Sequence, residues 1–283
     1  MNFDRTLRLE NSNLQHGDYN DRVYLMKLSD KDNKDELLDT IIDLAQNRSY
    51  GKIFTKVKSG DSELLMERSF ECEATVPGLY NGKEDGKFYS LFLDEKRRQV
   101  NTRQISQNIN LALDRKGRNL ACESFNIVEL DATFVDNIIK IYRDVFDSYP
   151  FPIFDKEYIL KSIENNVRIF AVIEKGEILA LASCEIDYEL NNVEMTDFAT
   201  PVEHRGRGLA QALLKFMEEE MIKSGIKTSY TIARSLSVGM NITFSKCNYS
   251  YGGTLKKNTN ISGGIESMNV WYKKLQKKQS MER

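Results

Sequence analysis

Residues 193–214 hold the feature that most constrains the fold: a strand pattern, a loop with two closely spaced glycines and an amphipathic helix. The loop runs from Pro201 to Gly208 and contains Gly206 and Gly208. Glycines at a strand-to-helix junction let backbone N–H groups converge on one spot, and the helix N-terminus adds partial positive charge. The segment therefore predicts a cradle for an anion such as a pyrophosphate.

Size and charge narrow the class of protein. The 283 residues are enough for two modest domains or one large one. Lys and Arg total 40 against 42 acidic residues, so no overall field favours nucleic acid or anionic lipid. The sequence has no apolar run of about 18 residues and no apolar signal region at its start. We therefore expect a cytoplasmic protein that binds neither nucleic acid nor membrane.

The cysteines and histidines are few and scattered. Cys72, Cys122, Cys184 and Cys247 form no CxxC pair, which disfavours a disulfide framework or a structural zinc site. His16 and His204 are the two histidines of the chain, so a Ser-His-Asp triad or a multi-histidine metal site is improbable. No metal cofactor is expected.

The C-terminal part reads as alternating helices and strands. Expected helices cover residues 134–146, 156–165, 209–223 and 238–246, and expected strands cover 168–173, 178–188, 193–200, 227–233, 250–255 and 266–275. This order predicts an α/β (α+β) fold with a mixed central sheet and helices on both faces.

The N-terminal part repeats some of that order. Strands are expected at 22–28, 52–57, 72–76 and 87–93, with helices at 34–47 and 63–69. The order matches residues 193–275, which suggests a duplication. The stretch 29–32 is acidic and lacks glycine, so a second phosphate site is not expected there. With 101–118 as a connector that forms one helix at most, we predict a smaller α/β domain at 1–118 and a main domain at 119–283.

The glycine loop fits neither of two common nucleotide motifs. Position 211 is Gln where a Rossmann loop needs its third glycine, and no Gly-Lys-Ser/Thr follows for a Walker loop. The loop resembles the acetyl-CoA loop of the GNAT acyltransferases, whose pattern is Gln/Arg-x-x-Gly-x-Gly/Ala. Placed on residues 203–208, the pattern fits except at Glu203. The resemblance implies acetyl-CoA as co-substrate and a GNAT sheet, with the N-terminal domain as a partial GNAT half. The implied cofactor-binding residues are Phe198, Ala199, Thr200, His204, Arg205, Gly206, Arg207, Gly208, Leu209, Ala210 and Asn241.

Carboxylates on the strand before the loop are candidates for the catalytic base. An amine with a pKa of about 10.4 must lose a proton before it attacks a thioester, and a carboxylate is a common acceptor. Strict alternation puts Glu194 on one face and Asp197 on the other, although a bulge would change that parity. Glu185 and Asp187 on the neighbouring strand are candidates for holding a cationic substrate.

The acid that protonates the leaving thiolate is missing from its usual GNAT position, where Phe244 replaces tyrosine. Either Tyr251 or Ser237 takes that role, or coenzyme A leaves as a thiolate. The Pro-aromatic stretch with Tyr149 and Phe151 predicts a wall of the acceptor site.

Segments over nearly the whole chain resemble the β-lysine N-acetyltransferase family within the GNAT superfamily. They are His16 to Leu28, Glu73 to Pro77, Tyr149 to Ile153, Glu194 to Thr200, Gly239 to Asn241 and Ser267 to Lys273. The resemblance implies transfer of acetyl to the N6 amine of β-lysine, which gives a compatible solute used in osmoadaptation.

Such a substrate also needs an Arg or Tyr for its carboxylate and an acid for its second amine, with Arg143, Arg168 and Arg234 as the candidate arginines. His16, Asp18 and Asn20 join the site if the N-terminal domain closes over it. The alternatives are a GNAT enzyme for a polyamine, lysine or a protein N-terminus, and a non-catalytic acetyl-CoA sensor. The expected partner is a small-molecule amine, and a homodimer stays open.

Overall fold

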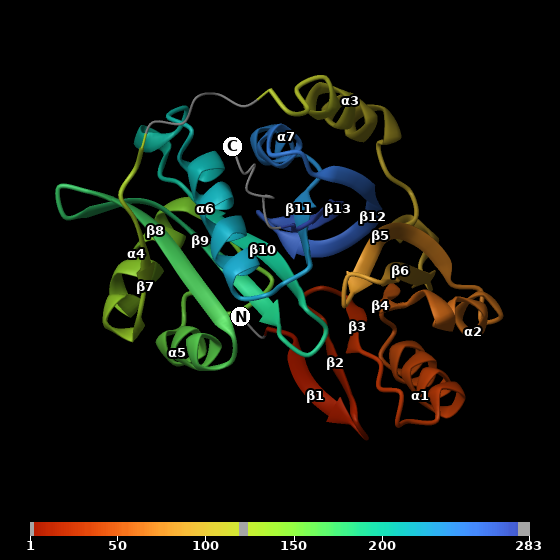
Figure 1. Ribbon diagram of the computed structural model, residues 1–283. Coiled ribbons are helices and arrows are strands. Elements are labelled where there is room, and N and C mark those ends of the chain that lie inside the picture. Colours follow the sequence, from red (N-terminus) through yellow and green to blue (C-terminus); the bar gives the residue numbers. More distant parts are fainter. Residues whose placement is uncertain (1–2, 119–123, 277–283) are drawn as a thin grey trace.

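The computed structural model describes residues 3–118 and 124–276, here called the N-terminal and C-terminal halves (Figure 1). Cys122 and the start of the predicted domain at 119 lie outside the described residues. No helix within the described residues is both long and apolar enough to span a membrane.

The C-terminal half follows the predicted order closely. Its helices are α4 (Val135–Val145), α5 (Lys156–Glu164), α6 (Leu209–Lys223) and α7 (Val238–Lys246). Its strands are β7 (Ile127–Leu130), β8 (Val167–Glu174), β9 (Glu177–Asp187), β10 (Asn192–Ala199), β11 (Thr228–Arg234), β12 (Ser250–Ile261) and β13 (Gly264–Lys274). Short β7 was not predicted, and β12 extends well beyond its predicted end at residue 255.

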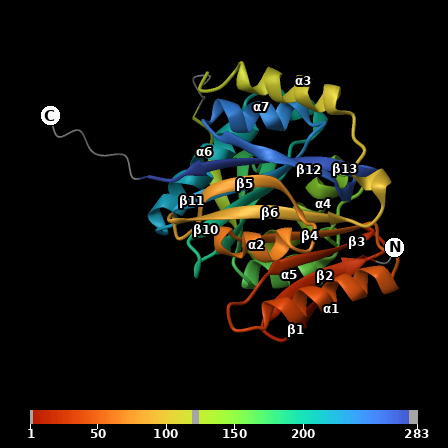
Figure 2. The same cartoon turned by 90° about the vertical axis from the view of Figure 1, so that its right-hand side faces the viewer.

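The N-terminal half contains α1 (Lys34–Asn47), α2 (Ser62–Met66) and α3 (Thr102–Leu113). Its strands are β1 (Arg5–Leu9), β2 (Ser12–Gly17), β3 (Arg22–Lys27), β4 (Lys52–Lys58), β5 (Glu71–Tyr80) and β6 (Glu84–Phe92). The hairpin of β1 and β2 was missed, and the expected connector forms α3, which packs on α7 (Figures 1 and 2).

The two halves share one sheet. Its order is β1-β2-β3-β4-β6-β5-β12-β13-β11-β10-β9-β8-β7, and Figure 2 shows the strands from β12 to β1 in succession. The run β2-β3-β4-β6-β5 has the same order and pairing directions as β9-β10-β11-β13-β12. The halves meet through antiparallel β5 and β12. The duplication and the domain boundary stay hypotheses.

A second pair of glycines allows the halves to meet. Gly253 pairs with Ala74, and a Cβ at Gly253 would lie 2.1 Å from the carbonyl oxygen of Glu73. A Cβ at Gly252 would lie 2.6 Å from the carbonyl oxygen of Thr75. Gly253 also has φ +144°, which side chains rarely adopt. Only glycine lets β12 approach β5 this closely.

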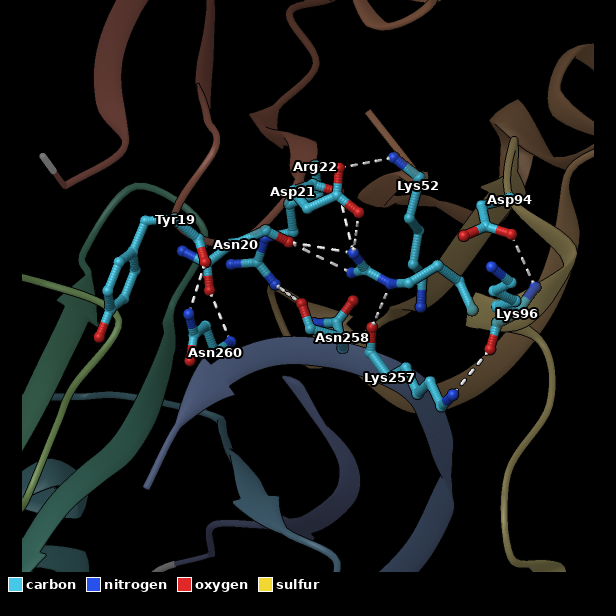
Figure 3. Close-up of polar contacts among 12 residues, drawn as sticks. Tyr19, Asn20, Asp21, Arg22, Lys52, Asp94, Lys96, Lys257, Asn258 and Asn260 are labelled. Atoms are coloured by element: carbon cyan, nitrogen blue, oxygen red, sulfur yellow. Dashed lines mark hydrogen bonds and ion pairs between the residues drawn. The ribbon is translucent and has the colours of Figure 1, made fainter. Parts of the chain in front are cut away.

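Beyond that pair, side chains of the N-terminal half bind the backbone of β12. The β12–β13 ladder is irregular between Leu255 and Thr259. Lys52 donates to the carbonyl of Lys256 at 2.7 Å, and Arg97 donates to the carbonyl of Lys257 at 3.0 Å. The Asn20 side-chain oxygen accepts the N–H of Asn260 at 2.8 Å (Figure 3). Because buried backbone groups need partners, these bonds fix the path of β12.

The sheet curls so that the inner faces of its two halves oppose each other. One core under α1 and α2 includes Leu37, Ile41 and Tyr89, and a second core with α6 includes Leu213 and Trp271. A third core is shared, and joins Tyr24 and Phe54 of the N-terminal half to residues of α4, α5 and β11. This shared core borders the site described next.

Candidate active site

Strands β10 and β11 separate in front of the glycine loop. They pair in parallel only from Asn192–Thr228 to Glu194–Tyr230, although β10 continues to Ala199 and β11 to Arg234. Beyond Glu194 the facing backbone groups of the two strands are therefore free of each other. In the N-terminal half β3 and β4 stay paired to Leu25–Thr55, so the described part of that half has no comparable opening.

The glycine loop leaves the start of α6 open. Gly206 and Gly208 both have φ +82°, and no atom lies within 4 Å of a Cβ built on either. Gly208 is the N-cap of α6, and no side chain caps the helix. The first N–H groups of a helix have no partner within it. An anion such as the pyrophosphate of acetyl-CoA therefore fits this cradle in charge and space.

The arginines of the loop are only partly available to a ligand. Arg205 donates from Nε to the carbonyl of Thr200 at 3.0 Å and lines the cavity described below. Arg207 pairs with Glu174 at 2.9 Å and does not line it. The ion pair with Glu174 holds Arg207 outside the cavity, which does not support its predicted role in binding the cofactor.

A cavity of about 740 Å³ runs from the start of α6 past the split strands to the N-terminal half. Its volume lies in the range of small-molecule sites. The predicted site residues that line it are Tyr149, Phe151, Glu185, Glu194, Asp197, Phe198, Thr200, His204, Arg205, Gly206, Gly208, Leu209, Ala210 and Arg234. Thus the glycine loop, the strand carboxylates and the Pro-aromatic wall border one space.

A β-bulge turns Asp197 toward this space. The register of β9 and β10 shifts between Thr196 and Ala199, and Asp197 has φ +52°. The strict alternation that placed Asp197 on the other face is wrong for this reason. Its carboxylate accepts hydrogen bonds from the hydroxyls of Tyr149 and, at 2.6 Å, Ser183. Asp197 is therefore held firmly in place.

Three carboxylates line one end of the cavity, the end predicted to hold the acceptor amine. Glu185 and Glu194 lie opposite each other on β9 and β10, and Asp197 is close by. Desolvation, followed by repulsion from Glu194 and Asp197, raises the pKa of Glu185 to about 8. The side chain of Glu185 is exposed to the space of the cavity. Desolvation also raises the pKa values of Glu194 and Asp197.

The N-terminal half supplies residues of the cavity that the sequence analysis missed. Arg22, Tyr24 and Met26 of β3 and Phe54 and Lys56 of β4 line it. Lys56 donates from Nζ to the hydroxyl of Tyr230 at 2.8 Å. These residues occupy every second position of their strands, and two of them are charged although the strands are mostly buried. That pattern in the sequence could have indicated that one face of β3 and β4 lines a site. The N-terminal half does close over the site, but through these strands.

The segment from His16 to Asn20 serves the junction of the halves. Across the junction, Asn260 donates to the Asn20 side-chain oxygen and, at 2.7 Å, to the carbonyl of Tyr19. His16, by contrast, bonds through Nδ1 to the hydroxyl of Tyr50 at 3.0 Å within the N-terminal half. His16, Asp18 and Asn20 are not among the lining residues.

Asn241 and Tyr251 do not serve the cavity as predicted. The Asn241 oxygen accepts from Asn269 and Trp271 at 2.8 Å each, and its nitrogen donates to the carbonyls of Arg234 and Ser237. It has no hydrogen-bonding group left for a cofactor, contrary to the prediction. The hydroxyl of Tyr251 pairs with Thr254, and Tyr251 does not line the cavity, whereas Ser237 does. An acid role for Tyr251 has no support in this geometry.

The predicted carboxylate-binding arginines are occupied elsewhere. Arg234 lines the cavity but pairs with Glu266 at 2.7 Å. Arg168 pairs with Glu129 at 2.7 Å, and Arg143 donates to the carbonyl of Phe154 at 3.3 Å. Neither Arg168 nor Arg143 lines the cavity.

Comparisons with known proteins agree with this geometry. The sequence model of the family described as "Acetyltransferase (GNAT) family" matches residues 135–238. A Methanococcus maripaludis protein named beta-lysine N(6)-acetyltransferase is 38% identical over 276 residues, 96% of this chain and 99% of that protein. The chain belongs to the GNAT acetyltransferase family. This GNAT acetyltransferase is also similar to N-acetyltransferase YodP of Bacillus subtilis, at 31% identity over 93% of this chain and 95% of that protein. A Methanosarcina mazei protein named beta-lysine N(6)-acetyltransferase is 36% identical over 48% of this chain and 50% of its own length.

Family membership confirms the predicted fold and the acetyltransferase class, and GNAT enzymes use acetyl-CoA. The loop motif also fits in a second register. The pattern Arg-x-x-Gly-x-Ala matches residues 205–210, which run from the loop into the first turn of α6. In this register Glu203 is no longer a departure.

Proposed function

We propose that this GNAT acetyltransferase transfers acetyl from acetyl-CoA to the N6 amine of β-lysine. Two relatives carry that activity in their names, one of them aligned over 96% of this chain. Acetylation removes one positive charge and leaves a zwitterion, which suits a compatible solute that accumulates without counter-ions.

The charge balance of the acceptor end supports an amino acid with two amines. Glu185, Glu194 and Asp197 face Arg22 and Lys56 across the cavity, which leaves one excess negative charge once Glu185, whose pKa is about 8, has lost its proton. A diamino acid with both amines protonated carries one positive charge and so balances it. A polyamine such as spermidine carries more positive charge and has no carboxylate to place beside an arginine.

Glu194 is our candidate for the base. It is the last residue of β10 that pairs with β11, so it lies where the strands split. Its raised pKa keeps it basic enough to accept a proton from an ammonium group. Asp197, by contrast, already accepts hydrogen bonds from Tyr149 and Ser183 and fits a positioning role.

The backbone around the bulge is our candidate for stabilising the thioester carbonyl. Phe198 lies where the β9–β10 register is interrupted, so its N–H can point into the cavity as an oxyanion donor. Acetyl-CoA, when bound, supplies the acetyl group. The N6 ammonium first gives one proton to Glu194. The neutral amine then forms the new C–N bond, the C–S bond breaks, and the nitrogen releases its second proton to solvent in the cavity. Either Ser237 protonates the sulfur, or coenzyme A leaves as a thiolate.

A parallel assay tests the proposal. The purified protein is incubated with acetyl-CoA and with β-lysine, L-lysine, spermidine or a peptide with a free N-terminus, and the acetylated position is read by NMR. We expect the highest kcat/KM for β-lysine and acetylation at N6. Comparable or faster turnover of another amine would contradict the proposal, as would tight acetyl-CoA binding with no acetyl transfer.

A further inference from the structure

Arg22 is a buried cation with spare hydrogen-bonding capacity at the acceptor end of the cavity. It is 3% exposed and is the first residue of β3. Its guanidinium carbon lies 5.3 Å from the centre of the Tyr24 ring and 5.7 Å from that of Phe54. Both rings line the same cavity. Arg22 is therefore fixed in a pre-formed aromatic wall.

The partners of Arg22 are neutral. Its Nη1 donates to the carbonyl of Asn258 and, at 3.2 Å, to the hydroxyl of Thr259 (Figure 3). Within the described residues no carboxylate forms an ion pair with it, and neither Nε nor Nη2 has a hydrogen-bond partner. The Nε atom is fully buried without one. Asp4 attracts the guanidinium of Arg22 without forming an ion pair with it. A buried guanidinium that no carboxylate pairs with is costly, so this arrangement points to a ligand that supplies the paired charge.

The residues near Arg22 indicate how a ligand would be oriented in the cavity. Tyr24 lies close enough to Arg22, Glu185 and Glu194 for all three charges to act on its hydroxyl. The cavity thus presents acids on β9 and β10 and an arginine on β3. In β-lysine the order from the reacting end is amine, second amine and carboxylate, which matches acids followed by an arginine.

We propose that Arg22 binds the carboxylate of the acceptor amino acid and thereby sets the preference for amino acids over simple diamines. The proposal rests on the proposed function, since it uses β-lysine as the acceptor. A guanidinium suits this task because its planar N–H groups match the two oxygens of a carboxylate. The glycine loop that would hold acetyl-CoA lies in the C-terminal half, whereas Arg22 lies in the N-terminal half. Each half would therefore recognise a different substrate.

The experiment compares β-lysine with 1,4-diaminopentane, which has the same two amines on the same carbon skeleton and lacks only the carboxylate. The proteins are the full-length wild type, Arg22→Gln and Arg22→Lys. We expect the wild type to favour β-lysine by about 100-fold in kcat/KM, as loss of a buried charge pair typically costs. Arg22→Gln should lose most of that preference, about 100-fold for β-lysine and less than about 3-fold for the diamine. Arg22→Lys keeps the charge and should fall in between.

Acetyl-CoA binding, measured by calorimetry, reports whether each variant is folded, since the glycine loop lies at the other end of the cavity. If Arg22→Gln fails to bind acetyl-CoA, the ratio of the two substrates for Arg22→Lys decides. A parallel fall for both substrates in a folded variant would overturn the role of Arg22 and leave the proposed function intact. No acetylation of β-lysine by the wild type would overturn the proposed function itself.

Discussion

The Nζ of Lys56 on β4 donates a 2.8 Å hydrogen bond to the hydroxyl of Tyr230 on β11. Four strands separate β4 from β11 in the sheet, so this bond exists only because the sheet curls back on itself. Tyr230 also lies opposite Glu194 in the register of β10 and β11. A strand from the first 60 residues thereby reaches the proposed catalytic carboxylate.

Replacing the proposed base should slow acetyl transfer without weakening cofactor binding. We expect Glu194→Gln to lower kcat about 100-fold or more, because general-base catalysis typically contributes that much. The KM for acetyl-CoA should change little. Glu177→Gln is the matched control, since Glu177 is an exposed glutamate at the other end of the neighbouring β9. A loss below about 3-fold would move the role to another carboxylate.

The raised pKa values predict how activity depends on pH. Burial raises the pKa of Glu185 to about 8, so this carboxyl is mostly protonated throughout the acidic range, and the pKa of Glu194 is also raised. Since only the ionised forms bind an ammonium group or accept its proton, kcat/KM should rise with pH up to about pH 8. In Glu185→Gln the part of this rise that Glu185 causes should disappear. A flat profile from pH 5.5 to 8.5 for the wild type would refute this account.

Protonation of Glu185, which should lower activity, should raise the stability of the ligand-free protein. A glutamate in the unfolded chain has a pKa of about 4.3, so between about pH 4.3 and 8 the folded state binds more protons at Glu185. Its contribution to stability is complete below that window and is lost as the pH rises through it. We expect the melting temperature of Glu185→Gln to depend less on pH than that of the wild type. Calorimetry at several pH values measures this, and equal slopes would contradict it.

A charge in the glycine loop should remove the cofactor site. Gly206→Glu places a carboxylate and bulk in the cradle, and we expect acetyl-CoA affinity to fall at least about 30-fold by repulsion of the pyrophosphate. Gly176→Glu is the control, because Gly176 has φ +84° and equally open surroundings in the β8–β9 turn. Both variants should lose about 1–2 kcal/mol of stability from the left-handed backbone. Unchanged affinity in Gly206→Glu would refute the placement of the loop.

The junction of the halves should depend on Gly253. A methyl group there would overlap the backbone of Glu73, so we expect Gly253→Ala to lower the free energy of unfolding by about 2–5 kcal/mol. Urea denaturation measures the loss. Gly264→Ala on β13 is the control, since its Cβ meets no atom within 4 Å, and it should stay within about 0.5 kcal/mol. Similar values for the two variants would show that β5 and β12 separate easily.

Local signals predicted the elements that have strong amphipathic patterns. The bounds of α1 and α6 agree with the expected 34–47 and 209–223, since apolar spacing and flanking breakers define both helices. The hairpin of β1 and β2 was missed because its sequence is mostly polar. Its strands pair at the sheet edge, and only alternating leucines such as Leu7 and Leu9 mark them.

In the site, too, the residues of a local motif were predicted and those placed by the tertiary fold were not. The donor loop is a local motif, so Gly206 and Gly208 were identified from sequence. Arg22 and Lys56 were not, because their place in the cavity follows from the curl of the sheet, and the curl depends on the close approach of Gly253 to Glu73. The bulge at Asp197 could be foreseen only as an alternative to strict alternation. No residue next to Asp197 in the sequence indicates that this aspartate has a positive φ.

The sheet that runs through both halves has a consequence for how such an enzyme changes during evolution. The loop proposed to hold the donor leads into α6, whereas part of the proposed acceptor wall lies on β3 and β4, more than 140 residues earlier in the chain. Substitutions on those two strands can therefore alter which amine is accepted while the acetyl-CoA loop is left untouched. New acceptor specificity is accessible to this architecture without a period of lost donor binding.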